Sequence, residues 1–349
     1  MMLAWLEELV SCESPSSSAE ATAECGRVFT AIAEPLLGEP ERIDIGGFRH
    51  LRWTFGTPRV LVLGHLDTVW PLGTLARWPF RVDGDVATGP GAFDMKAGVV
   101  QALRALSMLP SLDGVCLLLN VDEEVGSPTS RDLIIDTARG CSAALVCEPA
   151  SGLAVKTARK GIAMYDVTVT GRAAHAGLEP EKGINAAVGL AHAVLALASM
   201  GAPELGTTVT PTVLSGGTTT NTVPAAATVA VDVRAELPAE LERVDEAVRS
   251  LSVPLPGAAV AIGGGINRPP LDASSSAALF ALAETLSPGL QGISVGGGSD
   301  GNFTAGAGVP TLDGLGAVGD GAHAEGEHVL VSHMEPRAQL LAALLGELL

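Results

Sequence analysis

Several short polar segments of the sequence contain residue types that bind divalent metal ions. They hold His65 and Asp67 in GHLDTV (64–69), Asp94 in TGPGAFDMKAG (88–98), and Glu123 and Glu124 in NVDEEVGSPTSR (120–131). Two residues that are two apart at a strand end can face the same side, and an imidazole ligand usually needs a carboxylate or carbonyl to orient it. Adjacent carboxylates are costly unless a cation compensates them or one is protonated.

Two later segments add comparable residues. Glu148 follows the apolar run AALVC, and His323 lies in the small-residue stretch GAVGDGAHAEGEHV (316–329), with His328 nearby. Each residue taken alone also has an ordinary structural interpretation: a structural histidine, a helix N-cap aspartate at Asp94, or an acid in an exposed loop. The set as a whole favours a site.

The number and type of these residues match a site for two ions. Zn²⁺, Mn²⁺ and Co²⁺ accept imidazole and carboxylate ligands. A pair of ions about 3.5–4 Å apart needs one bridging carboxylate and two terminal ligands for each ion. His65, Asp94, Glu124, Glu148 and His323 supply that count. Glu123 is left as a general base for a water that the ions activate.

Parallel strands are expected to bring these residues together. RVLVLGH (59–65), CLLLNVDEE (116–124) and AALVCE (143–148) are short apolar runs, typical of strands buried on both faces. Helical patterns at 95–109 and 130–138 separate them. Alternating strands and helices predict an α/β fold with a mostly parallel sheet, in which sites form at the carboxyl ends of strands.

The pattern changes near residue 160. Strand-like and helical segments from 163 to 265 follow the order β-α-β-β-α-β, which is the ferredoxin-like split motif. Strand and helix alternation then resumes, with a helix near 273–286, the glycine-rich GGGSDGN (296–302) and a final helix from about 333. We therefore predict one catalytic domain (1–160 and 266–349), interrupted by a second domain (161–265).

Composition excludes several classes of protein. The net charge of −18, from 39 acids and 21 bases, argues against nucleic-acid binding, which needs clustered Lys and Arg. No apolar run reaches the ~18 residues of a membrane span. The N-terminal MMLAWLEELV contains Glu7 and Glu8 and predicts an amphipathic helix, and the five scattered cysteines fit reduced thiols. We therefore expect a cytoplasmic protein.

In their order and spacing, these motifs resemble the M20 family of metallopeptidases. The resemblance covers nearly the whole chain and rests on GHLDTV, GPGAFDMKAG, DEEVGSPTSR, CEP, GRAAHAG and GAHAEGE. It implies that Asp94 bridges two ions, most commonly zinc, with His65 and Glu148 on one and Glu124 and His323 on the other. It also implies that Glu123 is the general base, that Asp67 orients His65, and that the Asp94–Met95 peptide bond is cis.

The same resemblance assigns roles within and next to the inserted segment. It implies a lid and dimerisation domain in which His175, in GRAAHAG, stabilises the oxyanion in the partner subunit of a homodimer. Asn221 and Arg234 would contact substrate. Arg268, in NRPPL, would hold a substrate carboxylate through a bidentate fork. Backbone N–H groups of the GGGSDGN loop, Gly298 among them, would approach the same group.

DEEVGSPTSR and GRAAHAGLEPEKG look most similar to the glutamate carboxypeptidase branch of the family. This similarity predicts cleavage of an amide bond to a C-terminal glutamate or a similar amino acid, in a small peptide or N-acyl amino acid. An N-acyl-amino-acid deacetylase or aminoacylase uses the same machinery and stays open as the alternative. A non-catalytic binding protein would lack Glu123 or a metal ligand, and all of them are present.

Overall fold

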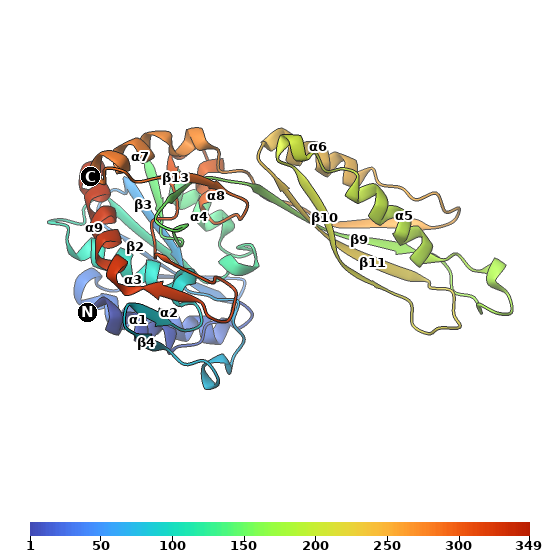
Figure 1. Cartoon of the computed structure of the whole chain (residues 1–349), viewed down its shortest axis with the longest axis horizontal. Coiled ribbons are helices and arrows are strands. Elements are labelled where there is room, and N and C mark those ends of the chain that lie inside the picture. The colour runs from blue at the N-terminus through green and yellow to red at the C-terminus, as the bar shows by residue number, and fades with distance from the viewer. The chain divides into compact units, whose positions relative to one another are not determined.

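The computed structural model describes residues 1–349, and the chain divides into two compact units (Figure 1). The first unit comprises Met1–Arg159, Leu271–Val295 and Ser299–Leu349. The second comprises Lys160–Pro270 and Gly296–Gly298. The chain therefore leaves the first unit after Arg159 and re-enters it at Leu271. No helix combines the length and the apolar character that crossing a membrane requires.

A six-stranded sheet with the order β1-β2-β6-β3-β7-β14 forms the centre of the first unit. The strands are β1 (Glu41–Ile45), β2 (Phe48–Thr54), β3 (Val60–His65), β6 (Val115–Asn120), β7 (Ala143–Val146) and β14 (Thr311–Leu312). β3 pairs in parallel with β6 and β7, and β14 pairs in parallel with β7. β1 and β2 are antiparallel. The predicted α/β fold with a mainly parallel sheet is confirmed.

Both faces of this sheet are buried. Along β3, Val60 and Val62 join the larger apolar cluster, whereas Leu61 and Leu63 join a second cluster, as expected for side chains that alternate between faces. The larger cluster includes residues of α1 (Met2–Val10), α2 (Ala19–Leu37), α3 (Ala97–Ser107), α7 (Ala273–Leu286) and α9 (Val331–Leu348). The second includes residues of α4 (Arg131–Arg139) and α8 (Gly301–Gly306). This burial explains why the strands are continuously apolar.

Two smaller sheets complete the first unit. One has the order β15-β16-β5-β4, with β15 (Gly319–Asp320), β16 (His328–Leu330), β5 (Val86–Thr88) and β4 (Arg81–Asp83). β16 pairs with β5, so the segment after His323 lies beside the segment before Asp94. The other sheet pairs β13 (Gly292–Val295) in parallel with β8 (Val155–Arg159).

The second unit is a four-stranded antiparallel sheet with two helices on one face. Its elements follow in the order β9 (Gly161–Thr170), α5 (Ala186–Ala198), β10 (Thr208–Gly216), β11 (Ala226–Ala235), α6 (Pro238–Arg249) and β12 (Ala259–Arg268). The strand order is β10-β11-β9-β12. On β9, Tyr165 and Val167 are buried in the same apolar cluster as residues of α5 and α6. Met164, which precedes Tyr165 on the strand, is 44% exposed.

In the N-terminal part, the structure contains three elements that the sequence did not predict: α2, β1 and β2. α2 contains Gly26 and Pro35, and the hairpin β1–β2 has charged, exposed positions, so neither has a strong apolar pattern. Strand β14 is short, because only Thr311 and Leu312 pair with β7.

Candidate metal centre

The predicted site residues of the first unit follow the carboxyl ends of three neighbouring strands. His65 is the last residue of β3, Glu123 and Glu124 form a 3₁₀ turn after β6, and Glu148 lies two residues after β7. Asp94 lies in the turn that leads into α3. Parallel strands end at the same edge of a sheet, so this placement gathers side chains from distant parts of the chain.

Asp94 lies between the two histidines. Its Oδ1 is 3.4 Å from His65 Nε2, and its Oδ2 is 3.5 Å from His323 Nε2. Glu148 Oε1 lies 3.5 Å from His65 Nε2, and Glu124 Oε2 lies 2.9 Å from His323 Nε2. The structure therefore forms two groups of three side chains that share the Asp94 carboxylate.

Asp67 connects His65 to the Glu123–Glu124 turn. His65 Nδ1 donates to the main-chain oxygen of Asp67 at 3.0 Å, and it lies 3.3 Å from the Asp67 carboxylate. That carboxylate accepts from the amides of Glu123 and Glu124 at 3.2 and 3.1 Å. Ser16 Oγ donates to it at 2.7 Å. With Nδ1 used in this way, His65 presents Nε2 to the acidic cluster.

The pKa values in the cluster reflect buried carboxylates close to imidazoles. Burial opposes ionisation of Asp94, but the nearby imidazoles of His323 and His65 outweigh it and hold the pKa of Asp94 below its usual value. Burial raises the pKa of Glu124 to about 7. Hydrogen bonds to Asp94 and Glu124 raise the pKa of His323 to about 10. The cluster thus stabilises positive charge at its centre.

Three buried polar atoms of the cluster have no hydrogen-bond partner: His65 Nε2, Asp94 Oδ1 and Glu124 Oε1. Such atoms are costly unless something binds them. The separations of 2.9 to 3.5 Å are close to the ~3.3 Å expected between tetrahedral ligands of an ion at about 2.0–2.1 Å. His65, Glu123 and Glu148 also offer ligand atoms within 4.8 Å of one another. The donor set therefore fits divalent metal ions.

The backbone at two of these residues is unusual. The Asp94–Met95 peptide bond is cis, as the sequence resemblance implied. α3 begins only at Ala97, and the Asp94 side chain caps no helix, so the alternative of an N-cap aspartate is wrong. His323 has a φ of 63°, in the left-handed region that is uncommon for a residue with a side chain. Left-handed backbone at a residue with a side chain is concentrated at functional sites.

Sequence reasoning missed an arginine behind Glu148. Arg159 is 4% exposed, and its Nη2 lies 3.4 Å from Glu148 Oε2. Its Nε donates to Asp313 Oδ2 at 2.6 Å. Burial disfavours the charged form of Arg159, but Asp313 and Glu148 outweigh it and keep the pKa of the guanidinium above its usual value. Asp313 directly follows β14, a strand-end position that offered a signal, whereas Arg159 offered none.

The second unit carries His175 and Asn221. The His175 side chain is exposed, and its Nδ1 accepts from the amides of Gly177 and Leu178 at 3.1 Å. An Nδ1 that accepts leaves the proton of the neutral ring on Nε2, which is therefore a hydrogen-bond donor. Asn221 is also exposed, and its carbonyl accepts from Ala176 at 2.9 Å, next to His175.

The two predicted substrate arginines differ in their surroundings. Arg234 pairs with Asp232 on the same strand, with an Nη2–Oδ2 distance of 2.8 Å. Arg268, at the end of β12, is 5% exposed. A Cβ added to Gly298 would lie 3.6 Å from Arg268 Cδ, so these two predicted carboxylate contacts are neighbours. No observation tests the roles of the inserted-domain residues, which stay predictions.

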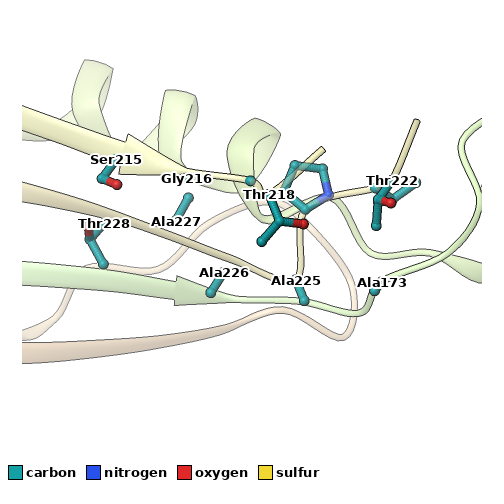
Figure 2. A pocket seen from close by; sticks show the side chains of 12 residues that line it. Ala173, Ser215, Gly216, Thr218, Thr222, Ala225, Ala226, Ala227 and Thr228 are labelled. Atoms are coloured by element: carbon teal, nitrogen blue, oxygen red, sulfur yellow. The ribbon is translucent and has the colours of Figure 1, made fainter. Parts of the chain in front are cut away.

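A pocket of about 490 Å³ lies in the second unit at the ends of β10 and β11 (Figure 2). Its lining includes Ser215, Gly216, Thr222 and Ala226, and Thr222 forms a β-bridge with His175. Figure 2 shows that the lining side chains are small. None of the lining residues is charged, so this pocket is not a metal centre.

Comparison with known proteins gives a relative that spans the chain. Carboxypeptidase G2 of Pseudomonas sp. (strain RS-16) is 31% identical over 98% of this chain and 88% of its own length. The succinyl-diaminopimelate desuccinylase of Azoarcus sp. (strain BH72) is 35% identical over 48% of this chain and 49% of its own. The chain is thus similar both to a carboxypeptidase and to a desuccinylase.

Solved structures share the fold. The M20 family metallo-carboxypeptidase Sso-CP2 from Sulfolobus solfataricus has a TM-score of 0.76 at 17% identity, with 99% of this chain and 98% of that chain covered. Aminopeptidase PepT from Bacillus cereus ATCC 10987 has a TM-score of 0.75 at 21% identity, with the same coverage. The family model for peptidase family M20/M25/M40 matches residues 61–347. The chain therefore belongs to peptidase family M20/M25/M40 and is a metallopeptidase of that family.

Proposed function

We propose that this metallopeptidase is a two-metal hydrolase that cleaves the amide bond to a C-terminal glutamate or a similar amino acid. The observation that carries the proposal is the position of Asp94. Its two carboxylate oxygens face different histidines, at 3.4 Å from His65 and 3.5 Å from His323. A carboxylate shared in this way is what a bridging ligand between two ions requires.

Each ion would have three protein ligands. His65, Asp94 and Glu148 would hold one, and Asp94, Glu124 and His323 the other. Three ligands leave a position of a tetrahedral ion open, as catalytic sites need. Zinc is the ion that this mixture of imidazole and carboxylate suits best, and cobalt and manganese accept the same ligands.

The chemistry divides between the ions and the chain. When bound, the two ions would lower the pKa of a water and polarise the substrate carbonyl. Glu123 would take a proton from the water whose oxygen attacks the carbonyl carbon, and would deliver that proton to the amine as the C–N bond breaks. Glu123 is 8% exposed, and its ligand atom is within 4.8 Å of those of His65 and Glu148. Asp67 would hold the His65 ring and the Glu123–Glu124 turn in fixed positions relative to each other.

The inserted domain would supply the substrate contacts. The Nε2–H of His175 has the donor character that an oxyanion needs. Asn221 and Arg234 would contact substrate as well. Arg268 and Gly298 are neighbours, and together they would hold the carboxylate of the amino-acid product. The similarity to carboxypeptidase G2 supports this substrate class.

An N-acyl-amino-acid deacylase is the second candidate. The similarity to succinyl-diaminopimelate desuccinylase favours it, because that name describes removal of an acyl group from an amino acid. The same metal centre and Glu123 would serve both reactions. The two candidates differ in which side of the amide bond the enzyme recognises.

We also propose a homodimer formed through the inserted domain. Strand β10 is at an edge of its sheet, with Val213 and Leu214 66% and 57% exposed. Leu195 on the adjacent α5 is 71% exposed. Edge strands with apolar side chains tend to pair with another chain. Light scattering on the intact protein and on a Leu195→Glu variant tests this proposal, and a monomer at all concentrations would contradict it. The cytoplasmic location stays a prediction.

A substrate panel tests the reaction. The zinc- or cobalt-loaded protein is incubated with N-acyl glutamates, including folate-type compounds, beside N-acetylornithine, N-acetyl-lysine and N-succinyl-diaminopimelate. Release of glutamate that is abolished in Glu123→Ala supports the carboxypeptidase. Preference for acylated basic amino acids or for the succinylated substrate supports the deacylase instead. No turnover of any compound by a protein that holds two ions would refute both.

A further inference from the structure

Glu327 is a buried carboxylate that the reaction scheme above does not use. It lies four residues after His323, immediately before β16, and its side chain is completely buried. The carboxylate nevertheless receives no hydrogen bond from a cationic side chain. Its four donors are neutral N–H groups. Burying a carboxylate is costly unless hydrogen bonds or a cation compensate it, and at Glu327 the compensation comes from these four N–H groups.

Each oxygen of Glu327 accepts two hydrogen bonds. Oε1 accepts from the main-chain amides of Phe93 and Asp94, at 2.8 and 2.9 Å. Oε2 accepts from the amide of Gly91 at 3.0 Å and from Trp70 Nε1 at 2.8 Å. Three of the four donors are thus consecutive or nearly consecutive amides of the turn that carries the Asp94 side chain.

These bonds tie together three segments that each carry a predicted metal ligand. Trp70 lies five residues after His65. The segment 91–94 ends at Asp94, whose carboxylate is shared, and Glu327 lies in the same loop as His323. The two oxygens of Asp94 face His65 and His323. A displacement of the Asp94 backbone would therefore change its distance to both histidines at once.

We propose that Glu327 is the positioning residue that fixes the Asp94 carboxylate between the two halves of the metal centre. It acts through the amides of residues 91–94 and touches neither substrate nor ion. The proposal rests on the two-metal site proposed above. It predicts that changes at Glu327 weaken the binding of both ions together, because Asp94 is common to both groups.

Glu327→Gln and Glu327→Asp separate position from charge. Glutamine offers one acceptor oxygen and turns an NH₂ group toward two of the N–H donors. Aspartate keeps the charge but is one methylene shorter, so it cannot reach all four donors. Glu325→Gln is the matched control, since Glu325 is in the same loop and its side chain is 73% exposed, 3.6 Å from Arg77.

The measurements are zinc binding by competition with a chelator, and hydrogen exchange of the metal-free protein. We expect both Glu327 variants to bind each ion about 10- to 100-fold more weakly, as is usual for residues that orient ligands. The amides of Gly91, Phe93 and Asp94 should exchange faster in both variants without any metal. Glu325→Gln should match the wild type in both measurements.

Other outcomes overturn the proposal in distinguishable ways. Wild-type affinity and exchange in Glu327→Asp would mean that charge alone matters. Weakening of one ion only would show that Asp94 is not the group being positioned. A wild-type protein that binds no second ion would instead refute the two-metal function itself. If Glu327→Gln does not fold, Glu327→Asp still decides between position and charge.

Discussion

Replacing Gly98 with alanine is expected to destabilise the first unit and to weaken metal binding at the proposed centre. Gly98 lies in the first turn of α3, against the end of β7. A Cβ at this position would lie 2.0 Å from the carbonyl oxygen of Cys147, the residue before Glu148. The obstacle is backbone, so no side-chain rotation relieves it. Either α3 or the segment that carries Glu148 must move.

The size of the effect follows from two opposing contributions. Overpacking of a buried position costs about 1–3 kcal/mol, and alanine returns up to ~1 kcal/mol of helix propensity. We expect a net loss of about 1–2 kcal/mol, because the overlap with a main-chain oxygen is severe. For a unit of this size the corresponding fall in Tm is roughly 2–8 °C.

The assay uses the distribution of aromatic residues. All four tryptophans, Trp5, Trp53, Trp70 and Trp78, belong to the first unit, so tryptophan fluorescence follows its unfolding selectively. Gly346→Ala is the matched control, because a Cβ there meets no atom within 4 Å on the exposed side of α9. It should leave stability unchanged or raise it by up to about 0.5 kcal/mol. A Gly98→Ala protein as stable as this control would show that α3 and the Glu148 segment accommodate the added methyl group without cost.

Further substitutions test the charges on the two units. Arg159→Met leaves the buried carboxylates of Asp313 and Glu148 without their cation, and breaking such a pair costs about 3–5 kcal/mol. A loss below 1 kcal/mol in a fluorescence-monitored denaturant titration would show that the pair contributes little. In the inserted domain, hydrogen bonds from Arg243 and Thr207 lower the pKa of Glu240 to about 2. Because the pKa of Glu240 is lower in the folded state, its ionised carboxylate stabilises the folded protein at pH values above the unfolded-state pKa near 4.5. This stabilisation is lost as the pH falls toward 2. Glu240→Gln should therefore reduce hydrogen-exchange protection of α6 at neutral pH and match the wild type near pH 2, whereas a constant difference would contradict this assignment.

The residues of the proposed metal centre were recognisable because each stands out locally. His65, Glu124 and Glu148 follow short apolar runs, and the burial of β3, β6 and β7 on both faces is what made those runs continuous. Strand ends of a parallel sheet converge, so local patterns were enough to predict a shared site. The strands of the second unit have a regular pattern for a similar reason, because one face of their sheet is covered and buried and exposed positions alternate.

The supporting residues were not recognisable, because their partners are distant in sequence. Glu327 binds amides more than 230 residues earlier, and main-chain amides carry no sequence signal. Arg159 donates a hydrogen bond to Asp313, which lies 154 residues later in the sequence. Local sequence patterns also did not predict the backbone conformation of Asp94, because an aspartate at the start of a helix ordinarily indicates an N-cap. Tertiary contacts, not propensity, fix these features.

The proposed role of Glu123 as general base is tested most directly by comparing Glu123→Gln with the wild type. Zinc content and hydrolysis of an N-acyl glutamate, or of the preferred substrate, are measured on the same preparations. Glutamine keeps the size of the side chain but cannot take a proton. We expect two ions per chain in both proteins and a loss of kcat of about 10²- to 10⁴-fold in the variant. Wild-type turnover by Glu123→Gln, with both ions bound, would contradict this role.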